Sequence, residues 1–384
     1  MRASLAAALA ALTLPLLATT APTQAADDVP PPTSRTALPR LKVTVVRSGL
    51  EVPWDVQSIG NGRLLYTERD RGTVTLLRAN GDARRVRLRG ARIWTEGETG
   101  MMSLQVDPRF AKNRRIYTCT GWRAAGGPEV RVVAWRLSDD LRSARRVRTL
   151  VDDIAINSAG IHGGCRLLIL RDGSLLVGTG DSRVGRNPQR LRSLNGKTLR
   201  LDRMTGRPWP GNRWADAKSN KRYVFTYGHR NVQGLAQRGD GSLWSVEHGT
   251  DRDDEVNLLR RGGNYGWNPV PGYNESVPMT DFSLPGKQIG ARWRSGHPTI
   301  ATSGATFVGG AGWGRLKGTL AVGVLKGSRL MFVKLDQRGR LEWTRAPKAM
   351  RQYGRLRSVT RVGNALLVTT SNGSNDKILR VRPR

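Results

Sequence analysis

Residues 60–81 read GNGRLLYTERDRGTVTLLRANG, two short apolar stretches separated by a polar gap and bounded by glycine-containing turns. Short stretches bounded by Asn-Gly and similar turns are typical of antiparallel strands joined by hairpins. The unit recurs along the chain and no long helical pattern competes with it. Clear copies are NRRIYTCTGW…VRVVAWRLSDD (113–140), RDGSLLVGTGDS (171–182), RGDGSLWSVEHG (238–249), LKGTLAVGVLKGSRLMFVKLDQRG (316–339) and VGNALLVTTSNGSNDKILRVRP (362–383).

The spacing of these units distinguishes between β architectures. They return roughly every 40–70 residues with several strands each, a period that favours propeller blades over a sandwich. Counting the units predicts an all-β, six-bladed β-propeller over residues 41–384. We expect the strand from Leu41 to Val46 to complete the last blade, because closing the ring removes exposed strand edges.

Polar groups gather around the predicted strand from Ser242 to Val246. GHRNVQG (228–234) precedes this strand, and EHG (247–249), DEVN (254–257) and GGNYGW (262–267) follow it. Packing does not require such groups at the ends of a strand, because burying them unpaired is costly. Loops that carry polar groups on a rigid scaffold are common places for binding sites, so we interpret this region as part of a site.

These motifs, in this order, resemble the GHRNPQG…EHG…DE-N…GGNYGW signature of the soluble quinoprotein glucose/sorbosone dehydrogenases. The resemblance runs from roughly Gly49 to the C-terminus. It implies a six-bladed propeller that uses pyrroloquinoline quinone (PQQ) and calcium to oxidise sugars.

Two further motifs supply side chains to the implied site. GETGMMSLQVDPRF (97–110) places Glu98 where the family has a polar residue that touches the quinone; a carboxylate that only caps a turn is the alternative. SAGIHGGCRLL (158–168) places His162 where the family has its general base, a role that an imidazole with a pKa near neutrality suits. A histidine that is only hydrogen-bonded is the alternative. Ile161 replaces the family's usual Asp or Asn, so the substrate preference stays open.

The resemblance also assigns a set of cofactor-binding residues. Arg230 and Asn231 contact PQQ in this assignment, and Arg230 stabilises the negative charge that develops on the reduced quinone. A structural ion pair is the alternative role of Arg230. Lys326 in VGVLKG and Arg355 and Arg357 in YGRLRSV match the family's motifs for the three PQQ carboxylates. Alternation along a strand places Arg355 and Arg357 on one face.

Calcium ligands follow from the resemblance as well. The backbone carbonyls of Gly249 and Thr250 match the pair that ligates the calcium next to PQQ, and backbone oxygens suit a hard cation. Asp254, Glu255 and the carbonyl of Tyr265 resemble a second, structural calcium site. A solvated acidic loop is the alternative for this second group.

The N-terminal sequence predicts export. Residues 1–25 have an arginine, an apolar run and small residues before a cleavage site near Ala25, which is the pattern of a signal peptide. Residues 26–40 read as a flexible lead-in. The apolar run is too short for a comfortable membrane span, so we expect a secreted or extracytoplasmic protein with no membrane span.

The net charge of +34 bears on partners. Such a charge suggests binding to nucleic acid, an anionic wall polymer or an acidic polysaccharide. The arginines, however, are spread along the chain and no nucleic-acid motif accompanies them. We therefore expect a solvated basic surface that adheres nonspecifically to anionic polymers, with no specific nucleic-acid partner.

The chain has two cysteines, Cys119 and Cys165, which lie in successive repeats. In an oxidising compartment an even pair predicts a disulfide; two small buried thiols are the alternative.

Together these observations predict an exported quinoprotein that oxidises an aldose-type sugar or related alcohol and passes the electrons to an external acceptor. Two other functional classes stay open. One is a cofactor-free propeller that binds a polysaccharide or a protein. The other is a calcium-dependent, lactonase-type hydrolase, against which the cations Lys326, Arg355 and Arg357 argue.

Overall fold

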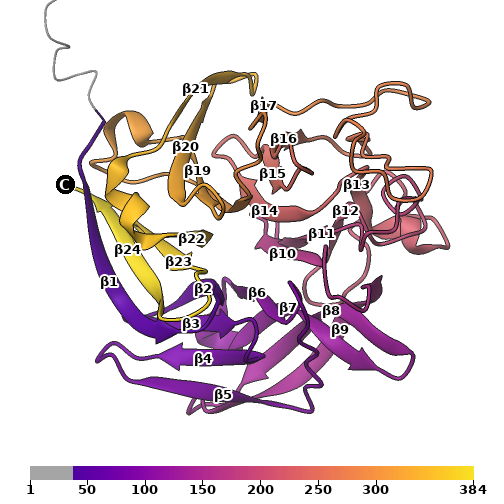
Figure 1. The fold of residues 1–384 in the computed structure, drawn as a ribbon. Coiled ribbons are helices and arrows are strands. Elements are labelled where there is room, and N and C mark those ends of the chain that lie inside the picture. The colour runs from indigo at the N-terminus through magenta and orange to yellow at the C-terminus, as the bar shows by residue number, and fades with distance from the viewer. Residues whose placement is uncertain (1–37) are drawn as a thin grey trace, which may run out of the picture. The chain divides into compact units, whose positions relative to one another are not determined.

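The computed structural model describes residues 38–384, and within them the chain is almost entirely β-strand. The strands form a ring of hydrogen-bonded antiparallel sheets (Figure 1). The predicted signal peptide, residues 1–25, and residues 26–37 of the predicted lead-in lie outside the described residues. Among the described residues, no helix is long and apolar enough to cross a membrane.

Three sheets follow each other directly along the chain, and each contains four strands in chain order. The first contains β10 (Gly164–Ile169), β11 (Ser174–Thr179), β12 (Lys197–Asp202) and β13 (Val224–Tyr227). The second contains β14 (Val232–Gln237), β15 (Leu243–Glu247), β16 (Glu255–Leu259) and β17 (Trp293–Arg294). The third contains β18 (Thr302–Phe307), β19 (Leu320–Val324), β20 (Arg329–Leu335) and β21 (Leu341–Arg345).

A fourth sheet joins the two ends of the described chain. It contains β22 (Leu356–Val362), β23 (Ala365–Thr370), β24 (Asp376–Pro383) and β1 (Leu41–Leu50). β1 pairs antiparallel with β24, with Leu41 opposite Pro383 and Val45 opposite Leu379 (Figure 1). The prediction that the strand beginning at Leu41 completes the last sheet is therefore confirmed.

The remaining sheet has eight strands, in the spatial order β2-β3-β4-β5-β9-β8-β7-β6. Its strands are β2 (Pro53–Gly60), β3 (Arg63–Glu68), β4 (Thr73–Leu77), β5 (Ala83–Arg89), β6 (Met101–Val106), β7 (Arg115–Ala124), β8 (Gly127–Leu137) and β9 (Ser143–Ala155). A parallel pairing of Arg87–Arg89 with Ser143–Arg145 joins its two halves. The sequence units did not predict this pairing.

The few helical turns lie between strands. They are α1 (Phe110–Asn113) and three 3₁₀ turns at Asn220–Tyr223, Gly314–Leu316 and Lys348–Tyr353.

Local turn chemistry explains the hairpins. In the turn before β11, the Asp172 carboxylate accepts hydrogen bonds from the backbone N–H and the hydroxyl of Ser174, at 2.9 and 2.7 Å. Asp240 does the same for Ser242 before β15. An Asp-Gly pair before a strand therefore fixes the turn through the aspartate side chain and leaves the following apolar residues to enter the core.

The core fills the spaces between neighbouring sheets. Val132, Val177 and Leu199, from β8, β11 and β12, are wholly buried in one such cluster. Each fully buried aliphatic side chain stabilises the fold by roughly 1.5–3 kcal/mol. The inner strands β2, β6, β10, β14 and β22 lie towards the centre of the ring, so their ends surround one axis (Figure 1).

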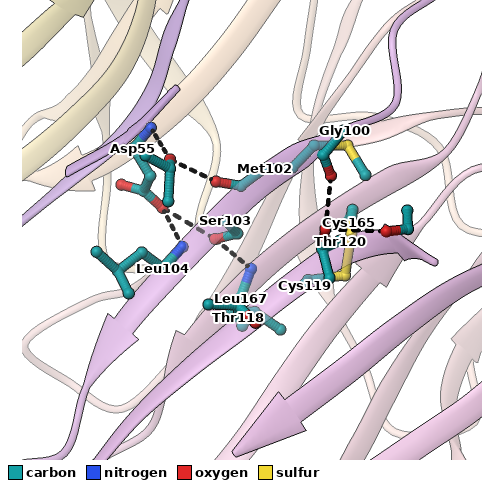
Figure 2. Close-up of a disulfide and its surroundings, with 12 residues drawn as sticks. Asp55, Gly100, Met102, Ser103, Leu104, Thr118, Cys119, Thr120, Cys165 and Leu167 are labelled. Atoms are coloured by element: carbon teal, nitrogen blue, oxygen red, sulfur yellow. Dashed lines mark hydrogen bonds between the residues drawn. A yellow bond between two sulfur atoms is a disulfide. The ribbon is translucent and has the colours of Figure 1, made fainter. Parts of the chain in front are cut away.

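A disulfide between Cys119 in β7 and Cys165 in β10 links two neighbouring sheets. Their Cα atoms are 5.4 Å apart, and both residues belong to the buried cluster (Figure 2). Next to the bond, the Thr120 hydroxyl donates to the carbonyl oxygen of Gly100 at 2.9 Å. The predicted pairing is confirmed, and closing a loop of 46 residues stabilises the fold by about 4 kcal/mol in the chain-entropy treatment.

Candidate active site

A cavity of about 290 Å³ lies at the ends of the inner strands. Of the residues that the sequence singled out, Glu98, Lys326, Arg355 and Arg357 line this cavity. These residues come from three separate motifs, which the ring brings together at one place. The cavity is also lined by Trp54, Gln233 and His248, to which the sequence analysis gave no role.

Two loops that pack backbone against backbone place Glu98 next to His162. The Thr99 hydroxyl and the Glu98 N–H both donate to the carbonyl oxygen of Gly160, at 2.7 and 3.2 Å. A Cβ atom on Gly160 would lie 2.0 Å from the carbonyl oxygen of Glu96, so only glycine permits this approach. The backbone N–H of His162 then donates to Glu98 Oε2 at 3.2 Å.

His162 forms a pair with Asp181, which follows β11. Its Nδ1 lies 2.8 Å from Asp181 Oδ1. Asp181 also accepts hydrogen bonds from the Trp267 indole N–H (2.8 Å) and the Tyr273 hydroxyl (2.7 Å). Because a carboxylate that is surrounded by donors acts as an acceptor, we assign the imidazole proton to Nδ1. His162 Nε2 forms no hydrogen bond within residues 38–384 and is the nitrogen left free to accept a proton.

The surroundings of this pair hold it in one arrangement. His162 has φ 58°, a left-handed conformation that is uncommon for residues other than glycine and is concentrated at functional sites. Burial raises the pKa of the Tyr273 hydroxyl, and the adjacent Asp181 raises it further. The Tyr273 hydroxyl therefore stays protonated and donates to the carboxylate.

A buried lysine holds the loop that contains Asp181. Lys197 is wholly buried, and its Nζ donates to the carbonyl oxygens of Asn187 (2.6 Å), Asn195 (2.7 Å) and Pro188 (3.0 Å). Burial lowers the pKa of Lys197 well below its ordinary value, while Asp181 acts in the opposite direction. The lysine thus fixes the loop between β11 and β12, which contains Asp181.

Arg230 lies close to the His162–Asp181 pair, and its side chain also contacts a carboxylate. Its guanidinium forms an ion pair with Glu275, and Nη1 lies 3.4 Å from the carbonyl oxygen of His248. Nε of Arg230 is buried with no hydrogen-bond partner among the described residues. The structural ion pair that the sequence left open is thus present, and a donor remains unused beside it.

Asn231, the residue after Arg230, has a side chain that connects to the cavity through another residue. Its Oδ1 accepts a hydrogen bond from Gln233 Nε2 at 3.0 Å, and its Nδ2 is buried without a partner among the described residues. Gln233 in turn accepts a hydrogen bond from Arg357 Nη1 at 2.9 Å. The amide of Asn231 is therefore connected to the cavity through Gln233, one of its lining residues.

The cavity has a strongly positive lining. Arg357 is buried, and burial with the nearby Arg69 lowers its pKa to about 9, so it remains charged at neutral pH. Lys326 and Arg355 add two further cations, whereas Glu98 is the only carboxylate among the lining residues. Burial opposes ionisation of Glu98, but His248, His162 and Arg357 together lower its pKa. Such a lining suits a ligand with several negative charges.

His248 contributes an uncharged imidazole to the cavity. Burial lowers its pKa to about 4, so the ring is neutral at physiological pH. Its Nε2 is buried without a hydrogen-bond partner among the described residues, and its backbone N–H donates to the carbonyl oxygen of Asn231. In the EHG motif (247–249), the resemblance assigned a role to Gly249 but none to His248.

The two predicted calcium sites differ in the structure. The carbonyl oxygens of Gly249 and Thr250 accept no hydrogen bond within residues 38–384, which leaves both available as ligands. A Cβ atom on Gly249 would lie 2.0 Å from the carbonyl oxygen of Arg252, so this loop requires glycine. In contrast, Asp254 uses both carboxylate oxygens to accept backbone N–H groups, from Gly249 at 3.0 Å and Ile300 at 2.8 Å.

Glu255 faces a different buried network. Its Oε2 accepts a hydrogen bond from Asn257 at 3.2 Å, and burial together with Glu247 raises its pKa to about 8. The Tyr265 hydroxyl donates to the carbonyl oxygen of Leu258, and within residues 38–384 Tyr265 forms no hydrogen bond with Glu255 or Asp254. Among the described residues, no group of three or more His, Cys, Asp or Glu side chains forms a metal site. The second calcium site therefore stays a prediction.

Sequence reasoning missed Asp181, Tyr273, Trp54 and Gln233. Asp181 is the residue before the last in the segment RDGSLLVGTGDS (171–182), which was identified only as a copy of the repeat. A polar residue directly after an inner pair of strands was the available signal, because such ends converge on the ring axis. Tyr273 lies 111 positions from His162 in a region without repeats, and nothing in its local sequence marks it.

Comparison with known proteins gives consistent results. The family described as glucose/sorbosone dehydrogenase matches residues 50–380. The aldose sugar dehydrogenase of Escherichia coli K12 is 27% identical over 305 residues, which cover 76% of this chain and 79% of the relative.

Solved structures extend this similarity. The PQQ-bound aldose sugar dehydrogenase of Streptomyces coelicolor matches with a TM-score of 0.75 and 27% identity, covering 91% of this chain and all of that one. A glucose dehydrogenase-like oxidoreductase of Thermus thermophilus matches with a TM-score of 0.74 and 32% identity, covering 89% of this chain and all of that one. The match to these structures extends over the whole ring of sheets.

Proposed function

Because the chain belongs to the glucose/sorbosone dehydrogenase family, we propose that it oxidises an aldose-type sugar or related alcohol with PQQ as the hydride acceptor and calcium as an activator. The observation that carries this proposal is the His162–Asp181 pair beside a cavity with three cations. A base next to a positively charged cavity combines proton removal with binding of a polyanionic cofactor.

The chemistry of the cavity fits PQQ. Lys326, Arg355 and Arg357 match three carboxylates in number and sign. Three buried polar atoms in or beside the cavity have no partner among the described residues and so provide further hydrogen-bonding capacity. They are Asn231 Nδ2, Arg357 Nε and His248 Nε2. Unpaired buried polar groups are costly, so a ligand that satisfies them is favoured.

The residues of the chain then have distinct tasks. His162 Nε2 accepts the proton of the sugar hydroxyl, while Asp181 and Tyr273 hold the imidazole in position. When bound, PQQ supplies the two-electron acceptor for the hydride that leaves the sugar carbon bearing this hydroxyl. Arg230 stabilises developing negative charge, because its unused Nε remains a donor beside the ion pair with Glu275. An external acceptor then takes the electrons.

Calcium completes the proposed site. The carbonyl oxygens of Gly249 and Thr250 would hold it, and the absence of hydrogen bonds to them within residues 38–384 supports this role. Thr250 replaces the family's more common proline, which a carbonyl ligand tolerates. We keep Asp254, Glu255 and Tyr265 as a proposed second calcium site, whose ligands would have to come partly from other groups.

We further propose that the protein is exported and that its propeller has six blades. The disulfide between Cys119 and Cys165 supports export, since such bonds persist in oxidising compartments. The blade count follows if the eight-stranded sheet comprises two blades, β2–β5 and β6–β9.

Reconstitution tests the proposed function. Protein freed of cofactor is mixed with PQQ and calcium, and we expect a complex whose visible spectrum changes to that of the reduced quinone when an aldose is added. Omitting calcium should prevent this change. Replacing Arg355 and Arg357 with glutamine should weaken PQQ binding, whereas the same change at the exposed Arg192 and Arg338 should not. A wild-type protein that binds no PQQ in calcium would leave the cofactor-free binding propeller as the better interpretation.

A further inference from the structure

A row of arginines crosses the eight-stranded sheet. Arg89 in β5 lies opposite Arg145 in β9, Arg145 lies opposite Arg136 in β8, and Arg136 lies opposite Arg115 in β7. Residues directly opposite each other in neighbouring strands share a face of the sheet, and the strands are about 4.8 Å apart. We call these four residues the arginine row. The pairing of β5 with β9 across the two halves of the sheet adds Arg89 to the three arginines of β7, β8 and β9.

Three members of the arginine row have no polar partner. Arg89, Arg136 and Arg145 are exposed, and none of them forms an ion pair or a side-chain hydrogen bond within residues 38–384. Arg115 differs, because its Nη1 contacts the sulfur of Met204 at 3.3 Å. Like charges directly opposite each other in a sheet are destabilising, so this arrangement carries a cost that a bound anion would remove.

The arginine row borders a depression rather than a flat surface. A cavity of about 310 Å³ is lined by its three unpaired members, by Arg114 and by the polar residues Ser138 and Ser143. Asp139, the one carboxylate in this lining, already forms an ion pair with Arg114. The Nε atom of Arg114 is buried without a partner among the described residues. The depression therefore keeps a net positive charge and unused donors.

The positive surface continues along β5. Arg85, Arg87 and Arg89 alternate along this strand and so face the same side. Arg85 and Arg87 line a neighbouring depression of about 600 Å³. β5 lies at the rim of the ring, away from the inner strands (Figure 1). The surface is thus elongated, which suits a linear polymer more than a small ion.

The arginine row lies at the end of the sheet away from the candidate active site. Met101, three residues after Glu98, pairs with Thr120 near the end of β7, whereas Arg115 is the first residue of β7. About five residues of strand, at roughly 3.3 Å each, therefore separate the two ends. A polymer on the arginine row leaves the cavity open to small sugars.

We propose that the arginine row is a docking surface for a linear anionic polysaccharide that carries carboxylates. Arginine engages carboxylates through two parallel N–H groups, and the serine hydroxyls of the depression suit the hydroxyls of a sugar chain. No aromatic side chain is among the described residues that line the depression, so the stacking that single-stranded nucleic acid uses is not provided. This surface rests on no part of the proposed catalysis.

The test compares two triple variants of equal charge. R89Q/R136Q/R145Q removes the unpaired part of the arginine row, and R192Q/R261Q/R338Q removes three exposed arginines from other parts of the molecule. Each lowers the formal net charge from +34 to +31, since three positive charges are lost. Binding of the full-length protein to polygalacturonate, to neutral dextran and to a single-stranded oligonucleotide is measured at low salt and at physiological salt. At physiological salt, screening acts over about 8 Å.

We expect polygalacturonate to bind the wild type and the control variant, and dextran to bind neither. R89Q/R136Q/R145Q should weaken polygalacturonate binding at least tenfold more than the control, with a melting temperature no lower than that of the wild type, because it removes like charges that face each other. Equal weakening by both variants would mean diffuse charge and would overturn the proposal. Oligonucleotide binding that is as tight as polygalacturonate binding, and equally sensitive to the arginine row, would overturn the choice of polysaccharide.

Discussion

Two histidines of this chain form nearly the same pair with a carboxylate. His162 Nδ1 lies 2.8 Å from Asp181, and His229 Nδ1 lies 2.9 Å from Glu247. Both pairs follow from short polar motifs next to a strand, and both are largely shielded from solvent. By its two atoms alone, either pair qualifies as a general base with its supporting acid.

The second ring nitrogen separates the two pairs. His229 Nε2 is bonded to the Thr226 hydroxyl at 2.8 Å, and the ring stacks on Tyr265 at 4.6 Å. His162 Nε2 has no hydrogen bond among the described residues, and the residues that follow His162 line the cavity. The comparison teaches that the pair itself does not identify a base. A free nitrogen beside a cavity does.

The largest expected effect comes from removing the free nitrogen. His162→Ala should lower turnover by roughly 10²- to 10⁴-fold, the usual contribution of a positioned base, while PQQ binding changes little. Steady-state rates with an artificial electron acceptor, together with a PQQ titration, measure both quantities. A fully active His162→Ala enzyme would show that the base lies elsewhere.

Asp181→Asn should have the next largest effect, because it removes the charge that orients the imidazole of His162. We expect turnover to fall by at least roughly tenfold with PQQ binding retained. Asp240→Asn, in an exposed turn, is the matched control and should leave turnover unchanged. If both variants are equally active, the pair is structural, as the pair of His229 is.

His229→Ala tests whether the second pair, His229 with Glu247, is structural. It leaves the buried Glu247 without its histidine partner, which should lower the free energy of unfolding by about 2–4 kcal/mol. Urea denaturation measures this change, and the folded fraction should keep turnover above that of His162→Ala. A stable but inactive His229→Ala protein would reverse the roles assigned here.

Lys197→Met should cost less, about 2 kcal/mol of unfolding free energy. Three carbonyl oxygens lose their donor, but the buried charge disappears as well, so the two effects partly cancel. Lys317→Met, at an exposed position, is the control for urea denaturation. An unchanged stability would show that the loop after Asp181 does not depend on this lysine.

The smallest effect is a pH dependence from His248. Its pKa is about 4 in the folded protein against 6.5 as its ordinary value, so the unfolded chain binds the proton first. This contribution to stability is complete above the ordinary pKa and is lost as the pH falls towards 4. Between about pH 7 and about pH 5.5 we expect a loss on the order of 1 kcal/mol in calcium-free buffer.

Thermal melting across this pH range should show the decline in the wild type and a smaller one in His248→Gln. Equal declines in both proteins would assign the acid sensitivity to other groups.

The amino-acid sequence determined the features that depend on neighbours along the chain. Short apolar stretches and Asn-Gly or Asp-Gly turns predicted the strands, because such a turn is fixed by side chains two residues apart, as Asp172 and Ser174 are. The closing strand at Leu41 and the Cys119–Cys165 bond followed from the repeat order and the cysteine count. Lys326, Arg355 and Arg357 were identified because their motifs are local.

Only the tertiary structure decided which of these groups meet. Asp181 has no role in the sequence motifs, and only the fold places it against His162; Tyr273 reaches the pair across 111 positions. The parallel pairing of β5 with β9, which adds Arg89 to the arginine row, likewise has no local signal. The physical reason is that alternation and turn chemistry act over a few residues, whereas ring closure sets contacts between strand ends that are far apart in the chain.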